Sequence, residues 1–156
     1  MKRVVVTGLG LITSIGTGYD VSWNSLLNGK SGIKKIDHFD TEDLPCKIAG
    51  SLISNYDPLN HLDTKEIKRN DRFIQYGLAA AKLAVEDSGI QNLNDEEKIE
   101  IGVSVGSGIG GLETIYNGSI TLNERGSRKI SPFFIPSSLV NLLSGQISIK
   151  YGFKGP

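Results

Sequence analysis

Two short apolar runs, at residues 3–7 and 99–105, each lead directly into a glycine. The first is β-branched from Val4 to Thr7, which is typical of a strand buried on both faces. In the second, isoleucines and valines alternate with smaller or polar residues, and this pattern also predicts a strand. Helical patterns separate and follow the two runs, so we expect an α/β fold in which a mixed sheet carries helices on both faces.

The clearest helical pattern runs from Asp71 to Ser88. Either Asn70 or Asp71 can cap its start through a short side-chain acceptor, and Gly89 can end it in the left-handed conformation. Its apolar stripe consists of Ile74, Leu78, Ala81 and Val85. Gly77 and three successive alanines make this helix slim, so we expect a neighbour to pack closely against it.

Shorter patterns predict the remaining elements. We expect helices at residues 20–28 and 111–124, a charged helical turn at 64–69 and a strand within 47–53. A last helix is predicted to begin at a Ser137 or Ser138 cap and to stop at Gly152. The proline-rich, apolar segment 128–136 is predicted to be irregular. Together these elements should form one domain over residues 1–156, because this length supports a single core.

The composition narrows the classes of function. Basic and acidic residues balance at 17 each, so no global field favours nucleic acid or an anionic membrane. A charged partner would have to meet a local patch instead. The single cysteine, Cys46, cannot form an internal disulfide, which favours the reducing cytoplasm. Glycines break the apolar N-terminal run, so we expect neither a leader peptide nor a membrane span there.

The turn at residues 106–111 matches the G-x-G-x-x-G pattern of dinucleotide-binding proteins, after a predicted strand and before a predicted helix. That fingerprint also needs a strand ending in an acidic residue about 20 residues further on. Here that position falls at residues 127–130, which contain no acidic residue. An NAD(P)-binding domain therefore remains a distant alternative, and we interpret these glycines as allowing tight packing of helix against strand.

Six segments in a fixed order point to one family. They are VVVTGLG at 4–10, SGI at 31–33, IDHFD at 36–40, DRFIQYG at 71–77, IGVSVGSGIGG at 101–111 and RKISPFFIP at 128–136. In this order and spacing the chain resembles the β-ketoacyl-acyl-carrier-protein synthases, most of all the synthase II type. The resemblance implies the N-terminal half of a thiolase-like fold that works as a homodimer. It implies no metal and no cofactor.

The resemblance also implies a reaction. These enzymes take an acyl group from acyl carrier protein onto a cysteine and condense it with malonyl-acyl carrier protein, releasing carbon dioxide. By the resemblance, that cysteine is expected just after Pro156 and the two catalytic histidines later still, so we assign no catalytic residue here. Cys46 lacks an activating setting, and neither His38 nor His61 matches a catalytic position. We therefore expect residues 1–156 alone to be inactive; the alternative is a non-catalytic synthase-like partner or remnant.

Two groups of residues match binding positions of the family. The carrier-docking positions fall on Lys65, Lys68, Arg69, Arg128 and Lys129. On charge alone a solvated surface explains these residues better, whereas the resemblance favours docking of the acidic carrier. Ile109 and Phe134 match positions that line the acyl-chain pocket, with ordinary core packing as the alternative. We further expect half of such a fold to expose a large apolar face, and therefore to associate or to be partly disordered unless a partner covers that face.

Overall fold

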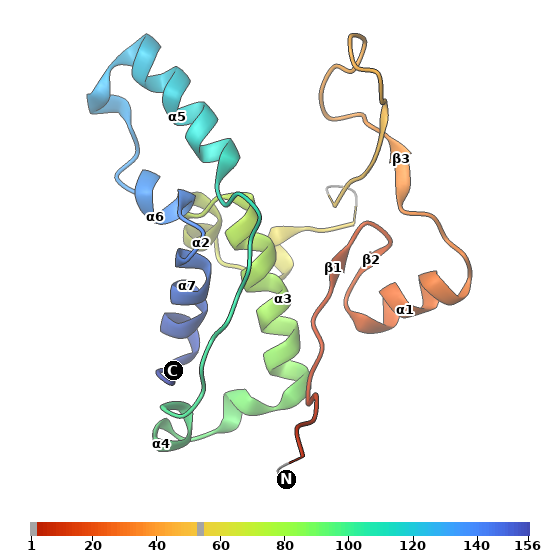
Figure 1. The fold of residues 1–156 in the computed structure, drawn as a ribbon, viewed down its shortest axis with the longest axis vertical. Helices are drawn as coiled ribbons and strands as arrows, with labels where there is room; N and C mark the ends of the chain where they lie inside the picture. Colours follow the sequence, from red (N-terminus) through yellow and green to blue (C-terminus); the bar gives the residue numbers. More distant parts are fainter. Residues whose placement is uncertain (1–2, 53–54) are drawn as a thin grey trace.

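The computed structural model describes residues 3–52 and 55–156. Helices dominate it: α7 packs against the long helix α3, whereas α1 and α5 extend away from α3 on opposite sides (Figure 1). The α-helices are α1 Tyr19–Leu27, α2 Thr64–Arg69, α3 Arg72–Ser88, α4 Asp95–Lys98, α5 Leu112–Arg125, α6 Phe134–Ser138 and α7 Leu142–Tyr151. The 3-10 turns are η1 Pro58–Asn60, η2 Ile90–Asn92 and η3 Ser127–Lys129. The strands are β1 Ile12–Thr13, β2 Gly16–Thr17, β3 Ile33–Lys35 and β4 Ile48–Gly50.

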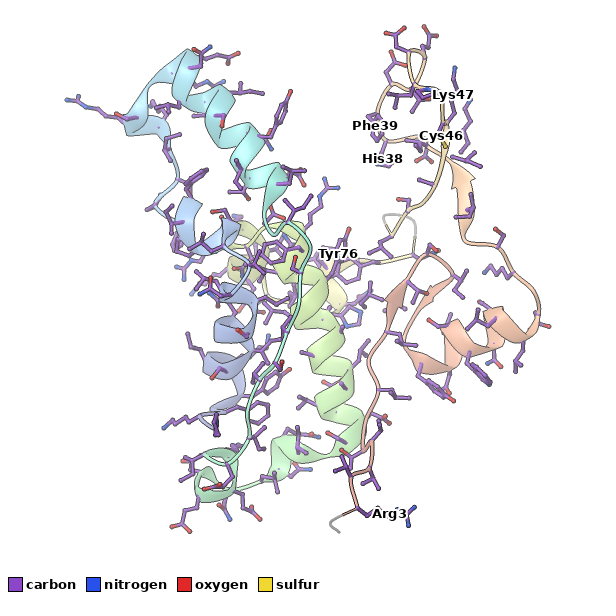
Figure 2. All side chains as sticks on the ribbon, in the orientation of Figure 1. Arg3, His38, Phe39, Cys46, Lys47 and Tyr76 are labelled. Carbon is purple, nitrogen blue, oxygen red and sulfur yellow. The ribbon has the colours of Figure 1, made fainter. Side chains whose placement is uncertain are left out.

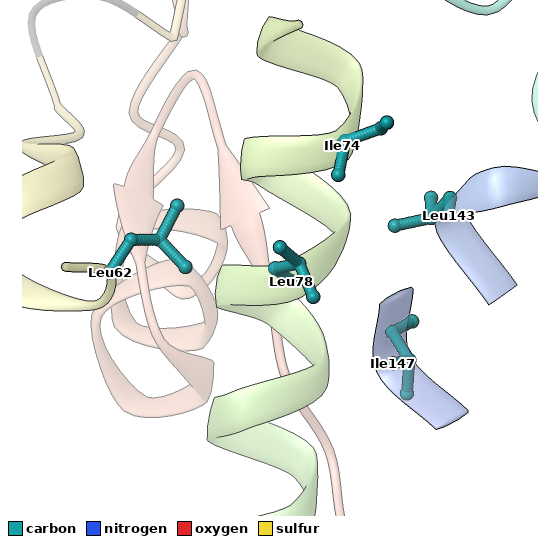
Figure 3. Close-up of a cluster of buried hydrophobic side chains, with 5 residues drawn as sticks. All are labelled: Leu62, Ile74, Leu78, Leu143 and Ile147. Atoms are coloured by element: carbon teal, nitrogen blue, oxygen red, sulfur yellow. The ribbon is translucent and has the colours of Figure 1, made fainter. Parts of the chain in front are cut away.

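Helix α3 is the centre of the core and follows its predicted pattern closely. The Asp71 side chain accepts from the Phe73 amide at its start, and Gly89 ends it with φ 73°, in the left-handed region. Ile74 and Leu78 are fully buried in a cluster whose other members are Leu62, Leu143 and Ile147 (Figure 3). This cluster joins α3 to α7, and each buried side chain contributes about 1.5–3 kcal/mol to stability.

Helix α7 and the N-terminal segment approach α3 closely at glycines, as the small residues of α3 predict. A Cβ on Gly77 would lie 2.5 Å from Leu143 Cδ2, so α7 can pack where it does only because Gly77 has no side chain. On another part of α3, a Cβ on Gly10 would lie 1.9 Å from the Ala80 carbonyl oxygen. The N-terminal glycines therefore serve tight packing. In the second glycine turn only part of this interpretation holds, because Gly106 and Gly108 have nothing within 4 Å of an added Cβ.

The two predicted core strands are not formed. Residues 3–7 are exposed, Val4 by 93%, and residues 101–107 form no ladder. Within the described residues, β1 pairs with β2 and β3 with β4, both antiparallel, so the predicted mixed sheet is present only as two separate pairs. The physical reason is that a strand exists only beside a hydrogen-bonded neighbour. Here Gly8 and Gly10, which follow the N-terminal run, lie against α3. Ile101 donates its amide to the Lys98 carbonyl at 3.3 Å and accepts from the Gly155 amide at 2.9 Å, and neither partner belongs to a strand.

The remaining helices match in part. Helices α1, α2 and α5 occupy the predicted ranges within a residue or two. The last helix starts at Leu142, later than predicted, because Ser137 and Ser138 end α6 and donate to the carbonyls of Phe134 and Ile135 instead of capping α7. The segment 128–136 is correspondingly more regular than predicted, since it holds parts of η3 and α6. Strand β4 confirms part of the strand predicted within 47–53, whose last residue, Ile53, lies outside the described residues.

The molecule exposes more surface than a compact monomer. Its accessible area is 10,866 Å², whereas a compact protein of 16.8 kDa has about 7,700 Å². Many large apolar side chains are exposed, and on α5 alone they include Leu112, Ile115, Tyr116, Ile120 and Leu122. The expected apolar face is therefore present. None of the helices in the described part of the chain is long and apolar enough to cross a membrane.

Candidate functional site

A groove of about 400 Å³ lies where the end of α2, the start of α3, the middle of α5 and residues 129–137 meet. Three of the five predicted docking residues line it, namely Lys68, Arg69 and Lys129. Phe134, one of the two predicted acyl-pocket residues, lines it as well. Lys65 and Arg128 are exposed neighbours on α2 and η3, outside the lining. The fold thus brings together residues that are about 60 positions apart in the sequence.

Helix α2 carries the first basic residues and is firmly held despite its six residues. A capping box joins Asp63 and Glu66 at its start, and the Glu66 amide lowers the pKa of the Asp63 carboxyl. Glu66 Oε2 accepts from the Asp63 amide, and Glu66 Oε1 accepts from Lys150 Nζ of α7 at 2.5 Å. At the other end, Gln75 Nε2 donates to the carbonyls of Ile67 and Asn70 at 3.2 and 2.8 Å. The positions of Lys68 and Arg69 are therefore fixed from both ends of α2.

The charge of the groove is positive. Glu113 is neutralised by Arg72, whose Nε lies 3.0 Å from Glu113 Oε2. The Arg69 guanidinium lies 4.8 Å from the centroid of the Phe133 ring, a cation–π contact. Within residues 3–52 and 55–156, neither Lys68 nor Lys129 forms an ion pair. Three cations therefore face the groove without a carboxylate partner in the described part of the chain, a setting that attracts an anionic ligand or an acidic protein.

The two predicted acyl-pocket residues lie apart. The Phe134 ring packs on α5 at Gly118, where a Cβ would lie 2.4 Å from Phe134 Cε2. Ile109 lies in the glycine turn before α5, outside the groove, with 66% of its surface exposed. The described residues therefore place Phe134 beside the predicted docking residues and leave Ile109 open on the surface. Their role in an acyl pocket stays a prediction.

One residue joins the parts of this region in a way that the sequence does not reveal. Asp71 is buried, and its Oδ1 accepts from the Phe73 amide at 3.2 Å while its Oδ2 accepts from Thr114 N at 2.9 Å and Thr114 Oγ1 at 2.7 Å. The cap on α3 was predictable, but the contact with α5 was not. A helix that starts at a bare glycine, Gly111, is the only sequence signal that a cap from elsewhere is needed.

The cysteine and the two histidines do not assemble into one site. Cys46 and His38 both lie in the loop between β3 and β4, away from the labelled Tyr76 of α3 (Figure 2). Cys46 is exposed and its Sγ donates to the Ile48 carbonyl at 3.4 Å, whereas His38 contacts the Phe39 ring edge-on. In the described ranges no group of three or more His, Cys, Asp or Glu side chains could hold a metal ion.

His61 is half-buried, and its ring stacks on Tyr56 with the two ring centroids 5.8 Å apart. Burial lowers the pKa of the His61 imidazole and raises the pKa of Tyr56 to about 12. Tyr56 also meets Tyr76 edge-on, and burial raises the pKa of Tyr76 in turn. This aromatic cluster borders a second cleft of about 190 Å³, which shares Arg72 and Gln75 with the main groove.

A family model described as "Beta-ketoacyl synthase, N-terminal domain" matches residues 1–156. The chain belongs to this family, which confirms the resemblance found in its sequence motifs. Among curated relatives, "3-oxoacyl-[acyl-carrier-protein] synthase 2" of Vibrio cholerae serotype O1 is 47% identical over 155 residues, which cover 99% of this chain and 37% of the relative. The chain thus spans well under half the length of such relatives.

Solved structures confirm the fold class. The ishigamide ketosynthase/chain length factor is 28% identical with a TM-score of 0.77, over 97% of this chain and 37% of that one. A β-ketoacyl synthase from Burkholderia phymatum STM815 is 25% identical with a TM-score of 0.78, over 100% of this chain and 38% of that one. The chain therefore has the α/β, thiolase-like fold predicted from its motifs, as part of an N-terminal domain.

Proposed function

We propose that residues 1–156 are the N-terminal portion of a 3-oxoacyl-acyl-carrier-protein synthase that elongates fatty acids. The family of the chain and the printed name of its curated relatives support this assignment. The full enzyme would take an acyl group from its carrier onto a cysteine thiolate with release of the carrier thiol. Malonyl-acyl carrier protein would then lose carbon dioxide, and the resulting enolate carbon would attack the acyl thioester and expel the cysteine thiolate.

In this proposal the chain binds and orients substrates, and no residue of it is catalytic. Lys65, Lys68, Arg69, Arg128 and Lys129 dock the acyl carrier protein, while Ile109 and Phe134 line the acyl-chain pocket. The observation that carries the docking role is the positive groove, where Lys68, Arg69 and Lys129 converge beside Phe134 without a carboxylate partner among the described residues. Electrostatic complementarity of this kind steers an acidic partner and speeds its association.

We further propose that the full protein acts as a homodimer in the cytoplasm. The exposed apolar side chains of α5 and the large surface of the chain support an interface with a second copy. The lone and exposed Cys46 fits a reducing compartment.

Charge reversal in the full-length protein tests the docking role. Lys68→Glu and Arg69→Glu should raise KM for the acyl-carrier substrate by at least about tenfold at low salt and leave kcat nearly unchanged, because they remove steering and uniform binding. Lys30→Glu, which reverses an exposed cation outside the groove, is the matched control. A small acyl thioester that carries no protein should react equally well with all variants. Unaltered KM for the carrier substrate at low salt would refute the docking assignment.

A further inference from the structure

The starts of two helices meet at a single carboxylate. Asp71 is the N-cap of the 17-residue helix α3, and the same side chain accepts from both N and Oγ1 of Thr114, the third residue of α5. The N-cap of α5 itself is Gly111, which has no side chain to offer. Asp71 therefore caps α5 from across the fold, over a sequence separation of 43 residues.

Asp71, Gly111, Thr114 and Ser138 form a tightly packed junction, in which Gly111 has no space for a side chain. A Cβ on Gly111 would lie 3.2 Å from Asp71 Oδ2 and 2.6 Å from the Cα of Ser138. The Gly111 amide in turn donates to the Ser138 carbonyl at 2.9 Å, which ties the end of α6 to the same point. In the described part of the chain no Lys or Arg forms an ion pair with Asp71, so its charge is met by amides at the starts of α3 and α5.

The junction lies between the two proposed binding functions. Arg69 ends α2 two residues before Asp71, while Ile109 precedes Gly111 by two residues, and Phe134 begins α6. We infer that Asp71 is a positioning residue, which sets the glycine turn with Ile109 and the helix with Phe134 relative to the carrier-docking residues. This inference rests on the proposed function. It predicts that the Asp71–Thr114 contact controls which acyl lengths the docked carrier can deliver.

Substitution of Asp71 by asparagine in the full-length protein is the direct test. Asparagine keeps the shape of the side chain but places an NH2 group where one of the two carboxylate oxygens lies, so one of the two helices faces a donor instead of an acceptor. Amide hydrogen exchange at Gly111 and Thr114 should then quicken by about fivefold, the factor that corresponds to losing a cap of about 1 kcal/mol. The ratio of kcat/KM for long against short acyl chains should shift by a similar factor. Thr114→Val should give a smaller shift, and Thr114→Ser, which keeps the hydroxyl, should behave as wild type.

The possible outcomes distinguish a failure of the positioning role of Asp71 from a failure of the proposed synthase function. Equal loss for every acyl length would leave Asp71 a merely structural residue and overturn the inference, as would unchanged exchange at Gly111 and Thr114. A wild-type protein that condenses no acyl group would overturn the proposed function, and exchange alone would then decide whether Asp71 holds the junction. If Asp71→Asn does not fold, Thr114→Val carries the same comparison, because it leaves the cap on α3 intact.

Discussion

Replacement of Gly77 by alanine should stabilise the protein only in a background where its neighbour Leu143 has been shortened. In the wild type the new methyl would lie 2.5 Å from Leu143 Cδ2 and 3.0 Å from its Cγ, so the buried side chain would be forced to move. Overpacking of this kind costs about 1–3 kcal/mol, against which alanine gains about 1 kcal/mol of helix propensity over glycine. We therefore expect Gly77→Ala to be neutral or to destabilise by up to about 2 kcal/mol.

The Leu143→Ala background removes the obstacle. By itself this change should cost about 2–5 kcal/mol, because Leu143 is 4% exposed and its loss leaves a cavity. Gly77→Ala should then stabilise by about 1 kcal/mol, since its methyl enters free space. The coupling energy between the two changes should equal the overpacking cost, about 1–3 kcal/mol.

Chemical denaturation followed by circular dichroism measures all four variants of this cycle, at several protein concentrations to separate folding from association. Gly145→Ala is the matched control, because an added Cβ there meets nothing within 4 Å. It should stabilise by about 1 kcal/mol in both backgrounds. A coupling below about 0.5 kcal/mol between Gly77 and Leu143 would refute the close packing of α7 on α3.

Three further outcomes are expected. Gly118→Ala should displace the Phe134 ring, and Ile109→Phe should shorten the acyl chains that the full-length enzyme accepts; unaltered chain-length preference in both variants would contradict the acyl-pocket assignment. The full-length protein should sediment as a dimer, and a monomer at micromolar concentration would contradict the proposed homodimer. Ultraviolet difference spectra should show a titration step near pH 12 that is lost in Tyr56→Phe and kept in the exposed control Tyr116→Phe.

The pH dependence that follows from Tyr56 has a definite sign. Its folded pKa lies above its unfolded value of 10.0, so its contribution to stability is fully present below pH 10 and is lost as the pH rises toward about 12. Burial is the main cause, because the ionised phenolate loses hydration beside Tyr76 and Asp57. A Tyr56→Phe variant should therefore lose less stability than the wild type between these two pH values.

The family and the helices were readable from the residues alone. The cap at Asp71, the stripe through Ile74 and Leu78, and the left-handed stop at Gly89 all arise from contacts within a few residues, so local pattern predicts them well. The motif order likewise predicted the synthase family and its fold class, which the comparisons confirm. The basic residues could be assigned to docking only through that resemblance, because charge alone favours a solvated surface.

Only the tertiary structure determines the contacts between segments that are distant in the sequence. Residues 3–7 and 99–105 have strand-like sequences, yet they remain unpaired as strands because a ladder needs a neighbour that no local pattern can supply. The same holds for the Glu66–Lys150 ion pair across 84 residues and for the Asp71–Thr114 cap across 43. Side chains so far apart meet only where tertiary packing brings them within hydrogen-bond reach, and the groove exists because of that packing.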